Sequence, residues 1–164
     1  MAEAFNDKIL PEARAQRYAA VAEEIAAVLD GEPNLVARMA TVSSMLAASF
    51  DHFFWTGFYV VDPDNREELV VGPYQGTLGC LRIAFGQGVC GTAARSRQTQ
   101  VVEDVEAFPG HIACDSRSKS EVVVPVRDAS GRLIAVLDVD SDRLAAFDEI
   151  DVEWLERIVA ETFG

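Results

Sequence analysis

The chain has 164 residues, of which 49% are hydrophobic, and its 27 acidic and 14 basic side chains give a formal net charge of −13. This length and composition predict a single globular domain over residues 1–164. The negative charge argues against nucleic acid or an anionic membrane surface as a partner, because both would be repelled. The apolar stretches are too short to span a bilayer, and the N-terminus lacks the pattern of a secretory signal. We therefore expect a cytoplasmic protein, whose thiols stay reduced.

Two amphipathic helices are predicted in the N-terminal part. Apolar residues recur at helical spacing over residues 14–29, and Asp30-Gly31 provides a stop signal. A second helix follows Pro33. Its apolar positions step by three and four residues: Leu35, Met39, Val42, Leu46 and Phe50. We expect the two helices to form a hairpin that packs against a sheet.

The remaining segments predict strands joined mainly as hairpins. Aromatic and β-branched residues mark strands over residues 53–61, 68–73, 99–102, 122–126 and 133–139, with a shorter apolar run near Ile83. Pro125 places its strand near an edge or a bulge. Residues 76–91 contain five glycines and should be irregular, residues 92–97 predict a short helix, and residues 104–119 a long polar loop.

A C-terminal helix completes the pattern, with Phe147 as a candidate staple and Asp148 as a candidate N-cap. Hairpin strands with helices at both ends predict an α+β fold. We expect a central antiparallel sheet of about six strands, flanked by the N-terminal helical hairpin and the C-terminal helix.

The three cysteines, Cys80, Cys90 and Cys114, lie in glycine-punctuated or loop sequence and not clearly on an apolar stripe. An odd number does not suit a purely structural disulfide framework, so the pattern indicates reactive thiols. Zinc is the alternative. However, the cysteines are ten and twenty-four residues apart, only His52 and His111 supply imidazoles, and no CxxC or HxxxH pair is present. We expect neither a metal site nor a cofactor.

Five segments together resemble a known family: WTGFY at 55–59, GQGVCG at 86–91, FPGHIACD at 108–115, SKSE at 118–121 and LDVDS at 137–141. They are similar to the GAF domain and, more narrowly, to the free methionine-(R)-sulfoxide reductases, over roughly residues 18–159. The resemblance implies reduction of free methionine-(R)-sulfoxide, rather than of the residue in proteins, with thioredoxin as the reductant. Paired GAF domains also make a homodimer plausible.

This chemistry needs an attacking thiolate and a second thiol that discharges the sulfenic acid. Cys114 is our first candidate for the nucleophile, because His111 and Arg117 lie three residues away on either side and positive neighbours lower a thiol pKa. The basic residues around it have a simpler explanation as a solvated loop surface. Cys80 is the preferred resolving thiol. Cys90 is either its rival, an auxiliary, or a small packed residue.

Three carboxylates, Glu121, Asp138 and Asp140, lie at the ends of two predicted paired strands, and Asp138 and Asp140 share a face. Crowded acids raise one another's pKa, so one could donate a proton to the sulfoxide oxygen. The alternative is that all three are solvated charges. The resemblance implies that Glu121 and Asp140 polarise the sulfoxide and that Asp138 holds the amino group.

Trp55 and Tyr59 share a strand face and could form an aromatic wall for the S-methyl group, although aromatics at this spacing are also typical of a sheet core. Two other functions remain open: a GAF module that binds a small ligand and signals, and a thiol redox sensor that is oxidised stoichiometrically. The chain ends just beyond its last helix, so we expect no output domain to receive a signal.

Overall fold

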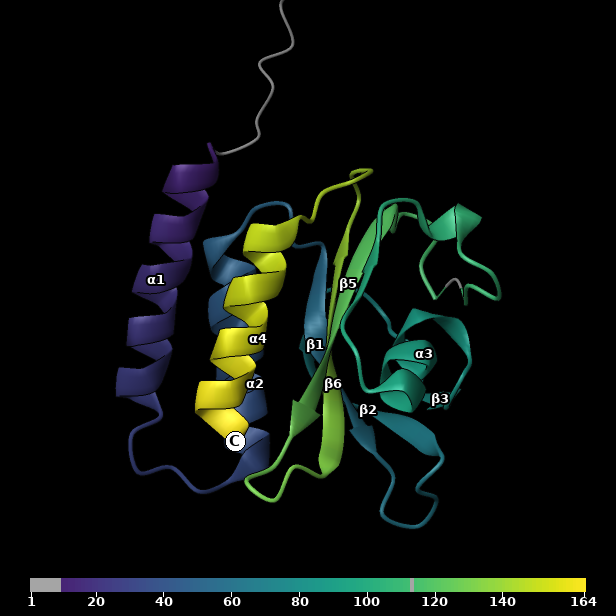
Figure 1. Ribbon diagram of the computed structural model, residues 1–164, viewed down its shortest axis with the longest axis horizontal. Coiled ribbons are helices and arrows are strands. Elements are labelled where there is room, and N and C mark those ends of the chain that lie inside the picture. Colours follow the sequence, from purple (N-terminus) through teal and green to yellow (C-terminus); the bar gives the residue numbers. More distant parts are fainter. Residues whose placement is uncertain (1–9, 113) are drawn as a thin grey trace, which may run out of the picture.

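The computed structural model describes residues 10–112 and 114–164, and in them a six-stranded antiparallel sheet carries helices on both faces (Figure 1). The helices are α1 (Pro11–Val28), α2 (Leu35–Ser49), α3 (Gly88–Ser96), the 3-10 turn η1 (Val105–Ala107) and α4 (Glu149–Phe163). The strands are β1 (Trp55–Val61), β2 (Glu68–Gln75), β3 (Arg82–Ala84), β4 (Gln100–Val102), β5 (Ser120–Arg127) and β6 (Leu133–Ser141). The predicted α+β class and the predicted number of strands are confirmed.

The strands lie in the order β3-β2-β1-β6-β5-β4, so the two longest hairpins meet at β1 and β6 in the middle of the sheet. Pro125 lies beyond the short β4 ladder, which pairs only with residues 121–123, and next to a register shift at Val126 and Arg127. Its missing N–H therefore interrupts no ladder on that side, and the predicted bulge is confirmed.

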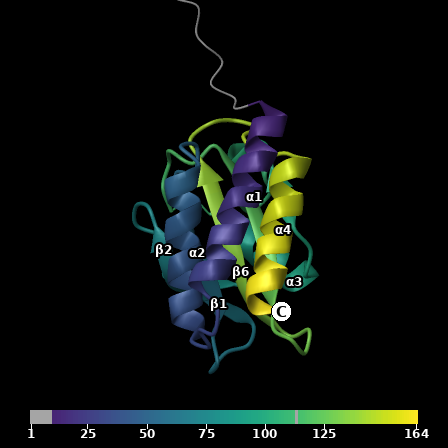
Figure 2. The same ribbon diagram turned by 90° about the vertical axis from the view of Figure 1, so that its left-hand side faces the viewer.

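The helices form two layers on one face of the sheet. In Figure 2, α1 lies in front of α2 and α4, which separate it from the strands. α2 packs against β1 and β2, α4 packs against β5, and α1 packs on α2 and α4. The predicted hairpin thus contacts the sheet mainly through its second helix.

A buried polar link fastens α1 to the start of α4. Arg14 pairs with Asp148 and Asp151, and the hydroxyl of Tyr18 donates to Asp151 Oδ1 at 2.8 Å. Asp148 also accepts from the backbone N–H of Ile150, and its own N–H donates to Asp151, which completes a capping box. The predicted N-cap is confirmed.

The opposite face carries α3, which starts earlier than the sequence predicts. We expected a helix over residues 92–97 after an irregular stretch, but α3 begins at Gly88 and Cys90 lies inside it, buried among apolar side chains. The prediction that Cys90 lies in a loop was therefore wrong. The glycines allow close packing here: a Cβ on Gly91 would lie 2.4 Å from the carbonyl oxygen of Ala84.

Among the described residues, no helix combines the length and the apolar character that a membrane crossing requires.

Candidate active site

A small cavity lies between the sheet and α3, on the face away from α1, α2 and α4. Its volume is about 50 Å³, enough for a few water molecules. Its wall includes both reactive and apolar side chains: Phe54, Trp55, Tyr59, Leu78, Ile83, Val89, Cys90, His111, Ile112, Cys114, Asp115, Ser118, Glu121, Asp138 and Asp140. Seven of the eight side chains singled out in the sequence line this cavity, and the eighth, Cys80, is bonded to one of them.

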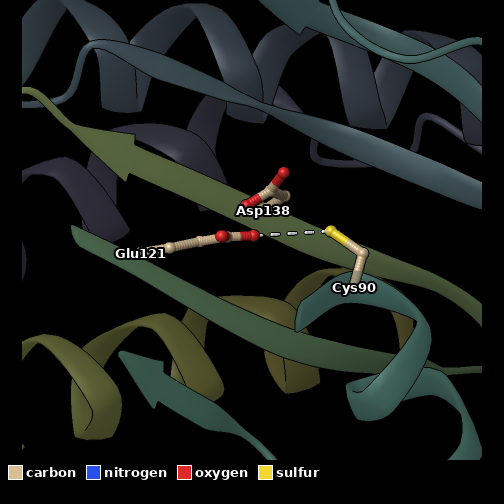
Figure 3. Close-up of side chains that lie close together, drawn as sticks. All are labelled: Cys90, Glu121 and Asp138. Atoms are coloured by element: carbon tan, nitrogen blue, oxygen red, sulfur yellow. Dashed lines mark hydrogen bonds between the residues drawn. The ribbon is translucent and has the colours of Figure 1, made fainter. Parts of the chain in front are cut away.

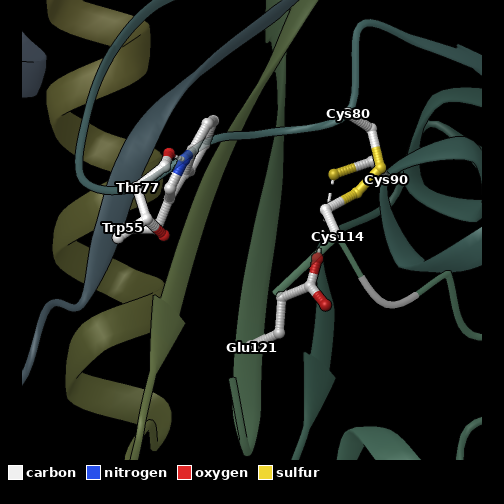
Figure 4. The surroundings of a disulfide bond; sticks show 6 residues. All are labelled: Trp55, Thr77, Cys80, Cys90, Cys114 and Glu121. Carbon is white, nitrogen blue, oxygen red and sulfur yellow. Dashed lines mark hydrogen bonds between the residues drawn. A yellow bond between two sulfur atoms is a disulfide. The ribbon is translucent and has the colours of Figure 1, made fainter. Parts of the chain in front are cut away.

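A disulfide between Cys80 and Cys114 joins the two loops at the mouth of the cavity (Figure 4). The Cα atoms of the two cysteines are 5.5 Å apart, within the range that a disulfide requires. Cys114 is exposed, Cys80 is half-buried, and Cys90 is the free, buried cysteine beside them. The fold therefore brings together two thiols that are 34 residues apart in the sequence.

The same two loops are also joined by hydrogen bonds. The Thr77 hydroxyl donates to Asp115 Oδ2 at 2.7 Å, and the indole N–H of Trp55 donates to the Thr77 carbonyl at 3.0 Å. Arg117 pairs with Asp115 at 2.7 Å and lies over the Phe54 ring. This ion pair holds the pKa of Asp115 below its usual range. The lowered pKa that we expect for Cys114 stays a prediction.

The three carboxylates converge because of the strand register. Glu121 on β5 lies directly opposite Asp140 on β6, and Asp140 lies opposite Trp55 on β1. Directly opposed residues share a face of the sheet, and Asp138 follows on that face two positions away. As predicted, Glu121 and Asp140 lie next to the ends of their strands, β5 and β6. They are not solvated charges of the kind the alternative would require: the exposed fractions of Glu121 and Asp138 are only 6% and 5%.

The thiol of Cys90 points at this acidic group (Figure 3). Its Sγ donates to Glu121 Oε1 at 3.8 Å. Asp140 accepts a hydrogen bond from the Ser118 hydroxyl at 2.8 Å. Within the part of the chain that the structure describes, Asp138 Oδ1 is buried without any hydrogen-bond partner. An acceptor in that position is suited to a donor that enters the cavity.

Burial and mutual repulsion favour the protonated forms of these groups. Burial, with Asp138 and Asp140 nearby, raises the pKa of Glu121 well above its usual value. Burial raises the pKa of Asp138 to about 6, and burial together with Asp138 raises that of Asp140. Burial, followed by repulsion from the nearby carboxylates, also raises the pKa of the Cys90 thiol. None of the described residues that line the cavity is a lysine or arginine, so the acids have no cation beside them.

Trp55 and Tyr59 form an aromatic wall of the cavity. Their rings stack with centroids 5.5 Å apart, and Tyr74 also stacks on Trp55, with centroids 4.9 Å apart. Both side chains are buried, so they belong to the core and to the cavity wall together. Gly79 allows the Cys80 loop to approach this wall, because a Cβ there would lie 3.0 Å from Trp55 Cζ2 and 3.0 Å from the Tyr59 hydroxyl oxygen.

Comparisons with known proteins agree with this geometry. The family model described as GAF domain matches residues 36–162. GAF domain-containing protein A of Dictyostelium discoideum is 50% identical over 144 residues, 88% of this chain and 89% of that protein. Free methionine-R-sulfoxide reductase of Saccharomyces cerevisiae is 41% identical over 133 residues, 79% of this chain and 74% of that protein. The chain belongs to the GAF domain family and, within it, to the free methionine-R-sulfoxide reductases.

A solved structure gives the same result for this GAF domain. The free methionine-R-sulfoxide reductase of Neisseria meningitidis, determined in complex with its substrate, superimposes with a TM-score of 0.86 and is 46% identical. The match covers 91% of this chain and 87% of that one. The recognised family and its enzymatic character are thereby confirmed, whereas a single domain over residues 1–164 and a homodimer stay predictions.

Several residues of the GAF domain's site were missed in the sequence. Thr77 and Asp115 connect the two cysteine loops, and Ser118 fixes Asp140. Asp115 and Ser118 lie in the segments that carry the family resemblance, which was their only signal. Thr77 carries no sequence signal, because its partner is 38 residues away.

Proposed function

We propose that this chain reduces free methionine-R-sulfoxide to methionine, with Cys114 as the nucleophile and Cys80 as the resolving thiol. One observation carries the proposal: the cysteine pair able to form a disulfide lies at the mouth of a cavity that is lined by three crowded carboxylates. The names of the yeast and Neisseria relatives support the choice of substrate.

The reaction balances with two thiols and no cofactor. The Cys114 thiolate attacks the sulfoxide sulfur while the sulfoxide oxygen takes up one proton. The bond between that sulfur and its oxygen then breaks, the hydroxyl passes to the cysteine sulfur, and methionine leaves as Cys114 becomes a sulfenic acid. The Cys80 thiol then attacks this sulfur, water departs, and the Cys80–Cys114 disulfide forms. The sulfoxide thereby gains the two electrons that the two thiols lose.

The raised pKa values suit the carboxylates to this chemistry. Glu121 lies opposite Asp140, and burial with the neighbouring acids raises its pKa and favours its protonated form. It can therefore donate to the sulfoxide oxygen, and Asp140, held by Ser118, shares that role. The unpartnered Oδ1 of Asp138 is suited to accept from the substrate ammonium. A peptide-bound residue has lost that ammonium, which accounts for a preference for the free amino acid.

The disulfide must be reduced again before the next turnover. Cys114 is exposed, so the thiolate of an external dithiol can approach its sulfur in line, and we propose thioredoxin as this reductant. Cys90 is buried in α3 and hydrogen-bonded to Glu121, which favours Cys80 over Cys90 as the first resolving thiol.

The deciding experiment counts methionine released per protein molecule from the separated R and S epimers of free methionine sulfoxide. We expect many turnovers on the R epimer with thioredoxin or dithiothreitol, and none on the S epimer. The Cys80→Ser variant should release about one methionine per protein without reductant, because the sulfenic acid still forms.

Two results would contradict the proposal in different ways. One equivalent of oxidation by peroxide with no methionine released from either epimer would indicate a stoichiometric redox sensor. Binding of another small molecule without any turnover, in protein whose thiols are reduced at the start, would favour a ligand-binding GAF module.

A further inference from the structure

The three side chains of Cys90, Glu121 and Asp138 form a second kind of site within the cavity. They come from α3, β5 and β6, and each offers one ligand atom within 4.8 Å of the other two (Figure 3). All three residues are buried, with exposed fractions of 4%, 6% and 5%. A sequence search for cysteine and histidine spacing could not find this cluster, because two of its members are carboxylates.

The distance between the Cys90 thiol and the Glu121 carboxylate suits a small tetrahedral ion. Zinc binds sulfur at about 2.3 Å and carboxylate oxygen at about 2.0–2.2 Å, which separates a tetrahedral sulfur and oxygen ligand by about 3.5 Å. Cys90 Sγ and Glu121 Oε1 are 3.8 Å apart. A shift of a few tenths of an ångström would therefore bring both atoms into bonding distance of one ion.

An independent observation indicates that the cluster lacks a ligand. The exposed fraction of Asp138 is only 5%. Its Oδ1 atom has no hydrogen-bond partner among the described residues. A buried carboxylate oxygen without a donor is costly, and a cation would satisfy it. The cavity of about 50 Å³ beside it has room for an ion and a water molecule.

We propose that Cys90, Glu121 and Asp138 bind a thiophilic divalent cation of the zinc class, with a water from the cavity as the fourth ligand. The mixed sulfur and oxygen ligands select this class, since magnesium and calcium require six or more oxygen ligands and do not favour thiolates. Binding displaces the thiol proton of Cys90 and any carboxyl proton to solvent. Three protein ligands and an open position leave the ion accessible and its binding reversible.

The ion and the substrate should exclude each other. This part of the inference rests on the proposed function, in which the substrate ammonium contacts the same Asp138 oxygen. Zinc would then be a reversible inhibitor that competes with free methionine sulfoxide, without touching the Cys80–Cys114 disulfide.

The first test measures metal binding without any activity. In the oxidised protein the disulfide leaves Cys90 as the free thiol, so titration with Co²⁺ should produce a sulfur-to-cobalt charge-transfer band that added Zn²⁺ abolishes. We expect the band to be lost in Cys90→Ser. Co²⁺ affinity should fall by at least about 10-fold to 100-fold in Glu121→Gln and Asp138→Asn, because even outer partners of a metal ligand have effects of that size.

A matched control separates ligation from general charge. Asp115→Asn removes a carboxylate from the same cavity wall but outside the cluster, and it should leave Co²⁺ affinity unchanged. Circular dichroism and the intact disulfide check that each variant is folded. The absence of a charge-transfer band at millimolar Co²⁺, or its persistence in Cys90→Ser, would overturn the proposal.

The second test addresses the competition. The double variant Cys80→Ser, Cys114→Ser keeps only the Cys90 thiol and cannot react with substrate. Free methionine-R-sulfoxide should displace Co²⁺ from it, while glycine, which chelates cobalt through the same amino and carboxylate groups, should not. Cobalt binding without displacement would overturn the competition and keep the metal site. If free methionine-R-sulfoxide displaces Co²⁺ but the wild-type protein shows no turnover, the metal site and the competition both stand, and only the proposed reductase activity is refuted.

Discussion

The two faces of the sheet have opposite properties, and β6 shows both. Leu137 and Val139 point to the layer of α2 and α4 and are fully buried among apolar side chains. Asp138 and Asp140 point to the α3 side, where burial raises the pKa of both. Strand alternation thus separates a face that stabilises the fold from a face that holds ionisable groups against their solvation preference. Changes on the two faces should therefore affect stability and activity independently.

The largest effect is expected on the active-site face. Cys114→Ser removes the proposed nucleophile and should lower methionine release by at least about 1000-fold, the order found when an enzyme's nucleophile is replaced. Unfolding in denaturant should match that of the reduced wild-type protein. Ser116→Ala, an exposed neighbour in the same loop, is the control and should keep its activity. Substantial turnover by Cys114→Ser would transfer the nucleophile's role to another thiol.

On the helix-covered face, Leu137→Ala should lower the free energy of unfolding by about 2–5 kcal/mol, because a fully buried side chain leaves a cavity. Urea unfolding measures this loss. Below the unfolding transition the turnover number should stay close to that of the wild type. A large fall in turnover by folded Leu137→Ala would show that the two faces are coupled.

Changing Asp138, the residue next to Leu137 on the other face of β6, should raise stability and lower activity. The pKa of Asp138 is raised to about 6 in the folded protein, so its contribution to stability is full below its unfolded pKa and is lost as pH rises through about 4 to 6. Asp138→Asn removes this loss, and its advantage in unfolding free energy over the wild type should grow by about 1–3 kcal/mol between pH 3.5 and pH 7. Activity should fall at the same time. An advantage that does not change with pH would contradict the raised pKa.

The smallest effect concerns His52, which lies among Phe50, Phe53 and Phe147 on the helix side. Burial, followed by Arg143 and Arg14, lowers its pKa to about 4. As pH falls, His52 therefore takes up its proton in the unfolded chain before it does so in the folded protein. The contribution of His52 to the free energy of unfolding thus decreases as pH falls from about 6.5 to about 4. Because the side chain is partly solvated, we expect only about 1 kcal/mol.

His52→Leu tests this effect, because it should remove the decrease in unfolding free energy that His52 causes between pH 6.5 and pH 4. Urea unfolding at several pH values measures this. The sign is opposite to that of Asp138, so the two variants should tilt the pH profile in opposite directions. Profiles that tilt in the same direction would show that one of the two pKa shifts has the wrong sign.

Local sequence patterns predicted most of the fold because they record periodic burial. The stripe of α2 and the alternation of β6 follow directly from side-chain spacing. The start of α3 was missed because glycine normally interrupts helices, whereas Gly91 is required by the close approach to Ala84. That error also placed Cys90 in a loop, although the helix buries its thiol against Glu121.

The site could be predicted only in part for a similar reason. The shared face of Asp138 and Asp140 follows from their spacing, but the pairing of Glu121 with Asp140 depends on the register of β5 and β6. The contact between Thr77 and Asp115 depends on how two loops meet across the cavity. Such long-range geometry has no local signal in one sequence.

The small cavity under the Cys80–Cys114 disulfide has a consequence for the cell. Pockets that hold drug-sized ligands typically measure about 300–1,000 Å³, so about 50 Å³ leaves no room for a whole amino acid while the two loops are joined. For a reductase of free methionine sulfoxide, the spent form then cannot retain its own product. Methionine could compete with its sulfoxide only for the reduced protein, so repair capacity would follow the supply of reducing equivalents.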